Sequence, residues 1–260
     1  MGRRGEGVPS AAAIIAAAGT GERLGAQAPK ALVELAGRPM LEWSLRAFAA
    51  APEVGTAIVA APPQDVGGFE EVTRAVEGGA ARSDADGALE VRVVEGGDTR
   101  SRSVAAAVEH VEAEIVAVHD AARPLVTPDL IAALIDKLLG RPDAAGVIAA
   151  TPIADTVKRA REPRPRRGEI ARGGPTIAKT ESRDHLWSAQ TPQVFRTAAL
   201  VSAVAASPQR LGEATDDAWL VEKDGGKVLI HPAPPENLKV TTPFELRVAE
   251  LLLAERRAGG

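Results

Sequence analysis

Short apolar runs alternate with amphipathic segments along most of the 260-residue chain. The lengths of the apolar runs and their Val and Ile content predict buried strands that end in loops, although the alanine-rich runs, such as the first, also fit a helix. The apolar runs occupy residues 11–19, 56–62, 89–97, 114–124, 144–152 and 227–234. Apolar residues at helical spacing predict helices at 39–50, 99–111, 127–139 and 242–258. Strands that alternate with helices predict an α/β fold whose mostly parallel, twisted sheet is covered on both faces.

The ends of three predicted strands carry most of the chemically distinctive residues. These strand ends lie at 19–23, 96–98 and 119–123. In open α/β sheets, ligands bind beyond the carboxyl ends of the parallel strands. We therefore expect a ligand site where these strand ends meet.

One long segment does not follow the alternation. Residues 156–184 have little apolar periodicity, and six arginines fall between Lys158 and Lys179. This pattern is typical either of a solvated loop or of an extended arm that projects from the domain.

The first residues, 1–10, are interpreted as a flexible leader rather than an export signal, and 11–260 as a single domain.

The composition excludes several classes of function. The chain has no cysteine, which excludes disulfides and thiolate chemistry, and its four scattered histidines argue against a zinc site. No run approaches the roughly 20 apolar residues of a membrane helix. The net charge of −4 argues against a general nucleic-acid-binding surface. We therefore expect a cytoplasmic protein with no nucleic-acid or membrane partner, and an anionic small substrate would need local basic clusters.

A glycine-rich loop, "GTGERLG" at 19–25, follows the first predicted strand. A dinucleotide-binding fingerprint needs a small residue where Leu24 stands, and the Walker A sequence is also absent. What remains is a turn whose amides can approach phosphate oxygens, with Arg23 and Lys30 as nearby cations. The spacing alone also fits a tight turn with surface charges.

A second candidate segment is "EGGDTRSRS" at 95–103. Its paired glycines allow close backbone approach, and Asp98 and Ser103 offer polar groups to a ligand. The alternative is a structural role, in which Asp98 or Thr99 caps the helix that follows.

Two more segments combine acidic and basic residues near predicted strand ends. In "VHDAARP" at 118–124, Asp120 could bind Mg²⁺ or a polar ligand and Arg123 a phosphate, or the two could pair to hold the loop. In "ENLKVTTP" at 236–243, Lys239 lies just before the last predicted helix. It is either an exposed lysine at a strand edge or a lysine that binds an anion, since burying an unpaired lysine is costly.

Together these segments resemble the 2-C-methyl-D-erythritol 4-phosphate cytidylyltransferase family of the non-mevalonate route to isoprenoids. The resemblance spans nearly the whole chain in the family's order, through "AAAGTGERLG", "PKALVELAGRPMLEWSL", "EGGDTRSRSV", "VHDAARPLVTPDLI", "TPIADTVKR", "LWSAQTPQVF", "EATDDAWLVE" and "ENLKVTTPFEL". The first stretch alone marks the wider nucleotidyltransferase group, whereas the full set is far more specific. The alternative is a ribitol-5-phosphate cytidylyltransferase, which would share the base and triphosphate sites.

The resemblance implies a single Rossmann-like nucleotidyltransferase domain with a projecting β-arm at 153–184 that is used in dimerisation. It implies a CTP-dependent enzyme that transfers CMP from CTP to methylerythritol phosphate and releases pyrophosphate with the help of Mg²⁺. The implied partners are these two small-molecule substrates and, through the arm, a second copy of the chain in a homodimer.

The resemblance also assigns roles to individual residues. The catalytic residues would be Arg23, Lys30, Arg183 and Lys239. The nucleotide would be surrounded by Ala17, Ala18, Gly19, Gly97, Asp98 and Ser103. The substrate-binding residues would be Asp120, Arg123, Thr156, Thr191 and Thr215, with Asp120 also the candidate metal ligand. Thr156 and Arg183 would reach the acceptor in the site of a second subunit.

The sequence departs from the family pattern in three places, one of which is a lengthened segment at 67–88. The arm is longer and richer in arginine than expected, and Ala31 follows Lys30 where a polar residue and then an aromatic are common.

Two functions of other classes are less well supported. Leu24 disfavours an NAD-dependent dehydrogenase, and the acceptor-side cations Arg183 and Lys239 disfavour a non-catalytic nucleotide sensor.

Overall fold

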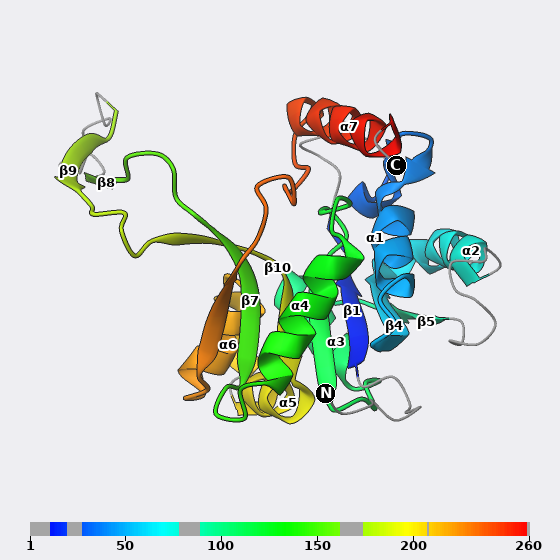
Figure 1. Cartoon of the computed structure of the whole chain (residues 1–260). Helices are drawn as coiled ribbons and strands as arrows, with labels where there is room; N and C mark the ends of the chain where they lie inside the picture. The colour runs from blue at the N-terminus through cyan, green and yellow to red at the C-terminus, as the bar shows by residue number, and fades with distance from the viewer. Residues whose placement is uncertain (1–10, 20–27, 78–88, 162–173, 207, 259–260) are drawn as a thin grey trace, which may run out of the picture.

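A central sheet organises the computed structural model, which describes residues 11–19, 28–77, 89–161, 174–206 and 208–258. In this part of the chain the strand order is β11-β7-β10-β6-β1-β4-β5 (Figure 1). The strands are β1 (Ala11–Ala16), β4 (Val54–Ala61), β5 (Glu90–Glu95), β6 (Ile115–Asp120), β7 (Gly146–Pro152), β10 (Trp187–Arg196) and β11 (Val228–Pro232). β10 is antiparallel to β6 and β7, and the other neighbouring pairs are parallel. The predicted α/β fold with a mostly parallel sheet is confirmed.

Helices cover both faces of the sheet, and β1 shows why. Its residues Ala11, Ala13 and Ile15 pack in one apolar cluster, while Ala12 and Ile14 pack in another. The first cluster includes residues of α1 (Met40–Ala49), α2 (Val66–Glu77) and α4 (Pro128–Leu139). The second includes residues of α3 (Arg100–Val108), α5 (Thr197–Ala206) and α6 (Asp217–Lys223). Because successive side chains of a strand point to opposite faces, a strand covered on both sides is apolar throughout.

The helices with clear start signals lie where the sequence predicts them. α4 begins with Thr127 as its cap, since Leu130 N donates to Thr127 Oγ1 at 3.3 Å. α7 (Pro243–Ala258) begins with a reciprocal capping box, in which Glu245 N donates to Thr242 Oγ1 at 3.3 Å and Thr242 N donates to Glu245 Oε2 at 2.7 Å. α1 and α3 also fall within predicted helical segments, whereas α2, α5, α6 and the antiparallel strand β10 do not follow from the pattern.

A smaller apolar cluster holds α7 against the main domain. It contains Leu35, Met40, Leu125, Val240, Ala249 and Leu253. The short elements near it are η2 (Lys30–Leu32), β2 (Glu34–Leu35) and β3 (Arg38–Pro39), and two further 3₁₀ turns, η3 (Pro63–Asp65) and η4 (Pro208–Gly212), lie elsewhere. Val240 is completely buried, and its N–H donates to Ala122 O at 2.8 Å. The segment before α7 is therefore attached to the loop that follows β6.

The predicted arm contains an antiparallel ribbon of β8 (Lys158–Arg161) and β9 (Thr176–Thr180). Every residue of the two strands is exposed, and the ribbon projects away from the sheet (Figure 1). The arginines at 162–173 and the leader at 1–10 lie outside the described residues. None of the helices in the described ranges is long and apolar enough to cross a membrane.

Candidate active site

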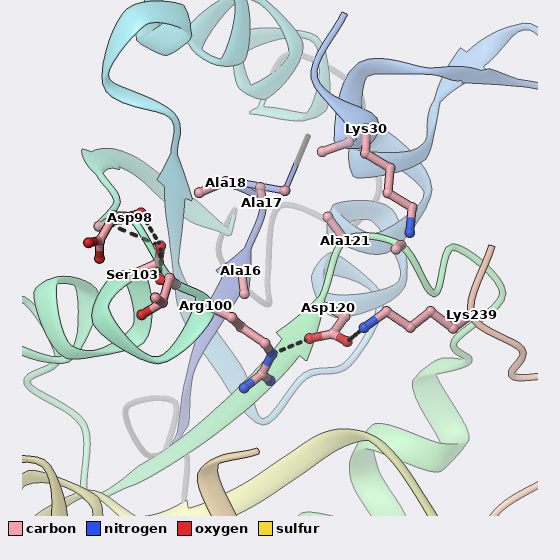
Figure 2. Close-up of a pocket in the computed structure, with 15 residues that line it drawn as sticks. Ala16, Ala17, Ala18, Lys30, Asp98, Arg100, Ser103, Asp120, Ala121 and Lys239 are labelled. Carbon is pink, nitrogen blue, oxygen red and sulfur yellow. Dashed lines mark hydrogen bonds and ion pairs between the residues drawn. The ribbon is translucent and has the colours of Figure 1, made fainter. Parts of the chain in front are cut away.

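A pocket of about 500 Å³ opens at the carboxyl ends of β1, β5 and β6 (Figure 2). It is lined by Ala16, Ala17, Ala18, Gly19, Lys30, Ala31, Gly97, Asp98, Thr99, Arg100, Ser103, Asp120, Ala121, Ala122 and Lys239. These residues come from strand ends and loops far apart in the sequence, at the edge of the sheet where α/β proteins bind ligands.

The turn after β1 forms one wall of this pocket. Ala17 N donates to Ala60 O at 3.1 Å, which keeps the start of the turn against β4. Lys30 N donates to Gly19 O at 3.2 Å, so the chain returns to the turn at the first residue of η2. Arg23, the second predicted cation of this loop, lies outside the described residues.

The loop between β5 and α3 forms the opposite wall. A Cβ atom at Gly97 would lie 2.5 Å from Arg102 Cβ, so α3 packs directly on this backbone and leaves room only for glycine. Gly97 N donates to Ser103 Oγ at 3.1 Å, and the Ser103 hydroxyl donates to Thr99 O at 2.9 Å. These bonds hold the Ser103 hydroxyl beside the Gly97 amide at the pocket wall.

Thr99 caps α3, which settles the question that the sequence leaves open. Arg102 N donates to Thr99 Oγ1 at 3.3 Å. Asp98 instead pairs with Arg102, whose Nη1 lies 2.6 Å from Asp98 Oδ2. The Asp98 side chain is 66% exposed and lies on the pocket rim, so it is accessible to a ligand.

A chain of four charged groups runs from the pocket into the protein interior. Arg100 Nε lies 2.6 Å from Asp120 Oδ1, and Lys239 Nζ lies 2.7 Å from Asp120 Oδ2 (Figure 2). Arg100 Nη1 continues to Asp217 Oδ2, at 2.8 Å. Asp120 therefore binds two cations, one on each carboxylate oxygen, and Asp217 lies behind Arg100.

These contacts shift the pKa values of the charged groups. Burial alone would raise the pKa of Asp120, but Arg100 and Lys239 lower it well below its usual range. Burial raises the pKa of Asp217, which the charge of Arg100 opposes. Burial alone would lower the pKa of Arg100, but Asp217 and Asp120 raise it above its usual value. Lys239 and Arg100 thus face a carboxylate that is ionised at neutral pH.

His119 and Thr191 form a buried hydrogen-bonded pair behind Asp120. Asp120 N donates to Thr191 Oγ1 at 3.0 Å. His119 Nε2 lies 3.2 Å from Arg123 O and Nδ1 lies 3.1 Å from Thr191 Oγ1. A carbonyl oxygen can only accept, so Nε2 carries the proton and Nδ1 accepts from the Thr191 hydroxyl. Thr191, a predicted substrate-binding residue, therefore contacts the backbone of Asp120 and is not among the pocket-lining residues.

Arg123, predicted to meet a phosphate, is turned toward the protein. Its Nη1 donates to Asn237 O at 2.7 Å and its Nη2 donates to Ala189 O at 3.5 Å. The residue is buried and does not line the pocket. The alternative expectation is that Asp120 and Arg123 pair to hold the loop. They do so through the backbone, where Arg123 N donates to Asp120 O at 2.9 Å, while the Asp120 carboxylate forms ion pairs with Arg100 and Lys239.

The remaining predicted residues lie away from the pocket lining. Thr156 and Arg183 are exposed near the base of the arm, where Arg183 Nη1 donates to Ala154 O. Thr215 is exposed in the loop just before α6. Within the described chain, none of these three contributes to the pocket.

Three charged or polar residues at this site were not predicted from the sequence. Arg100 is one of several arginines in a polar segment, and Asp217 and Asn237 come from segments more than a hundred residues away. A signal for Arg100 was present, since it directly follows the Thr99 cap and so must lie at the end of α3 that faces the strand ends.

The fold and pocket define an α/β nucleotidyltransferase-type domain with a cationic ligand site. The sequence model of the family described as IspD, 2-C-methyl-D-erythritol 4-phosphate cytidylyltransferase, matches residues 11–255. The chain belongs to this family. The resemblance expected from the sequence motifs is therefore confirmed.

Individual relatives agree with this assignment. A 2-C-methyl-D-erythritol 4-phosphate cytidylyltransferase of Streptomyces coelicolor is 43% identical over 248 residues, which cover 95% of this chain and 86% of the relative. The Synechocystis enzyme of the same name is 35% identical, with 94% and 97% covered. Among solved structures, the cytidylyltransferase of Thermus thermophilus has a TM-score of 0.67 at 31% identity, with 93% of this chain and 97% of that chain covered.

The buried histidine generates a prediction about acid stability. Burial, with the nearby charges of Arg123 and Arg100, lowers the pKa of His119 from its ordinary value of 6.5 to about 3. The unfolded chain therefore takes up a proton at this residue as the pH falls below 6.5, while the folded chain does not. The contribution of the neutral His119 to the free energy of unfolding is therefore fully present above pH 6.5 and is lost progressively as the pH falls toward 3. Between pH 7 and 5 this residue alone is expected to cost about 2 kcal/mol.

The measurement is the free energy of unfolding by urea at pH 7 and 5 for the wild type and His119→Gln, which keeps a donor but cannot titrate. The other three histidines are common to both proteins. The pH-dependent loss should be about 2 kcal/mol smaller in the variant. Equal losses in the two proteins would contradict the assignment of a neutral His119.

Proposed function

We propose that this chain transfers CMP from CTP to 2-C-methyl-D-erythritol 4-phosphate, giving 4-diphosphocytidyl-2-C-methyl-D-erythritol and pyrophosphate. The observation that carries the proposal is the convergence of Lys30, Asp120 and Lys239 beside a glycine turn, in a chain of this family. In the reaction, an oxygen of the acceptor phosphate attacks the α-phosphorus of CTP. The bond from that phosphorus to the α–β bridging oxygen breaks, and pyrophosphate leaves with the electron pair.

The chemistry requires positioning and positive charge more than a strong base. A phosphate monoester is already anionic at neutral pH, since its second pKa is about 6. The main obstacle is the repulsion between two polyanions, which fixed cations can offset. The pocket supplies Lys30, Arg100 and Lys239 in a protein whose net charge is −4.

The two pocket walls suggest how CTP lies. The amide-rich turn of Ala17, Ala18 and Gly19, with Lys30, would hold the triphosphate, and Arg23 would add charge from the same loop. The opposite wall of Gly97, Asp98 and Ser103 would hold the cytidine. Hydrogen bonds from a few fixed polar groups can select one base, because a wrong base leaves those groups unpaired.

Mg²⁺ fits this site as an ion carried by the triphosphate. In the described chain, no group of three or more His, Asp and Glu side chains could form a metal cage. Magnesium usually keeps several waters and binds through one or two carboxylates together with substrate phosphates. Asp120 is the pocket carboxylate between the two cations, and it would be the protein ligand. The ion would neutralise charge on the phosphates, while Lys30 and Lys239 orient them.

The arm suggests that the acceptor site is shared between two copies of the chain. Thr156 and Arg183 lie outside the pocket lining of their own chain, and the adjoining ribbon of β8 and β9 is fully exposed. We propose a homodimer in which the arm, 153–184, places Thr156 and Arg183 beside the acceptor in the other copy's pocket. Arg123, Thr191 and Thr215 would support that pocket from behind or from its rim.

We place the enzyme in the cytoplasm, where CTP is available, with no nucleic-acid or membrane partner. The acidic net charge supports the first exclusion. Both substrates are small and polar, so the reaction itself requires no membrane.

The function is tested by incubating the purified full-length chain with CTP and Mg²⁺ and measuring pyrophosphate release. Methylerythritol phosphate should support turnover, whereas ribitol 5-phosphate should support little. Preference for ribitol 5-phosphate would replace the proposed acceptor, and no pyrophosphate with either would overturn the proposal.

The two pocket lysines generate a prediction about catalysis. Lys30→Ala and Lys239→Ala should each lower kcat by about 10²–10³-fold, the usual loss when one group that stabilises developing charge is removed. Lys227→Ala is the matched control, because Lys227 pairs with Asp143 at the start of β11, the edge opposite the pocket. Steady-state kinetics would contradict the mechanism if both pocket variants keep rates within about threefold of the control.

A subunit-mixing experiment tests the shared site. Lys239→Ala and Arg183→Ala homodimers should each be nearly inactive. If Arg183 acts in the other copy's pocket, each mixed dimer contains one doubly impaired site and one intact site. An equal mixture, exchanged through mild denaturant, should regain about a quarter of wild-type activity. No gain in activity, with exchange verified by mass spectrometry, would show that Arg183 acts within its own chain.

A further inference from the structure

The segment that carries Lys239 has no regular secondary structure. Residues 233–240 lie between β11 and α7 and belong to no strand or helix. One backbone bond, from Val240 N to Ala122 O at 2.8 Å, joins the end of the segment to the loop after β6. No strand ladder therefore fixes the backbone from which Lys239 reaches the pocket.

Asn237, two residues earlier, makes the contacts that a ladder would otherwise supply. Its Nδ2 donates to Gln190 Oε1 at 2.8 Å and to Thr191 O at 2.9 Å, both in β10. The backbone carbonyl of Asn237 accepts a hydrogen bond from Arg123 Nη1 at 2.7 Å. Asn237 is 1% exposed, so these bonds form away from competing water.

The chemistry of this contact requires an amide nitrogen. Both groups that face Asn237 Nδ2, Gln190 Oε1 and Thr191 O, are acceptors. Asn237 Oδ1 is buried without a partner among the described residues, so the side chain contributes here only as a donor. A carboxylate of the same shape would place an acceptor against two acceptors and lose both bonds.

We propose that Asn237 is a positioning residue for Lys239. It holds the irregular segment on β10 so that the Lys239 ammonium stays 2.7 Å from Asp120 Oδ2, at the pocket. Arg123 serves the same end from the other side by binding the Asn237 carbonyl. The proposal rests on the proposed function, because it assigns Lys239 its role on the reacting phosphates.

The first test compares two variants that each introduce one carboxylate at the same contact. Asn237→Asp removes both donors, whereas Gln190→Glu keeps an acceptor oxygen for Asn237 Nδ2. Misplacing a catalytic group by about 1 Å can cost 10²-fold, so Asn237→Asp should lower kcat by about 10- to 100-fold. Gln190→Glu should keep kcat well above that value. Equal losses would assign the effect to the buried charge and overturn the proposal.

The second test asks whether Asn237 acts through Lys239. In a Lys239→Ala background, Asn237→Asp should lower kcat by no more than about twofold further, because the group that it positions is already gone. A purely structural role would instead multiply the two losses, and that result would overturn the proposal. Thermal unfolding shows whether each variant is folded at the assay temperature. If Asn237→Asp is not folded there, Asn237→Ala, which removes both donors without adding a charge, replaces it in the second test, and a kcat equal to that of the wild type would overturn the proposal.

Turnover by the wild-type protein distinguishes a failure of the role proposed for Asn237 from a failure of the proposed function. Turnover by the wild type, combined with multiplicative losses in the double variant, would overturn the role of Asn237 and leave the proposed function intact. Absence of turnover in the wild type with CTP, Mg²⁺ and methylerythritol phosphate would overturn the function and this inference together.

Discussion

The Asp120 carboxylate, held between Arg100 and Lys239, is the interaction on which the site depends. It joins the end of β6 to the start of α3 and to the segment before α7, while Arg100 continues to the buried Asp217 of α6. Removing Arg100 would leave the fully buried Asp217 without its cation, which is more costly than the pair itself is stabilising. The fold therefore holds Arg100 and Lys239 at the pocket through their common carboxylate, Asp120.

This arrangement also suggests why an acidic protein can bind a polyanion. Within the pocket, Asp120 already neutralises part of the charge of Arg100 and Lys239, so the cations do not repel one another strongly before a ligand binds. Phosphate groups would then share the Lys239 ammonium with Asp120 instead of binding an isolated cation. Preorganised charge of this kind does not have to be rearranged at the moment of reaction, which is the usual source of electrostatic catalysis.

Periodic segments of the sequence predict the fold well, and long-range contacts account for what they miss. Continuous apolar runs mark β1 and β6 because both faces of these strands are buried. β10 is missed because the polar and proline residues of "WSAQTPQVF" interrupt any alternation, and α2 because Gly67 and Gly68 weaken a helical prediction. In the site, the sequence indicates Lys30, Asp120 and Lys239 individually. It cannot indicate Asn237, whose partner Gln190 lies 47 residues away.

A crystal structure of the full chain with CTP and Mg²⁺ would test the proposed site most directly. In that structure the cytosine should lie against Gly97 and Ser103, the triphosphate should follow the turn after β1, and Lys30 and Lys239 should both contact phosphate oxygens. A nucleotide bound outside this pocket, or one whose phosphates lie away from Lys239, would contradict the proposed site.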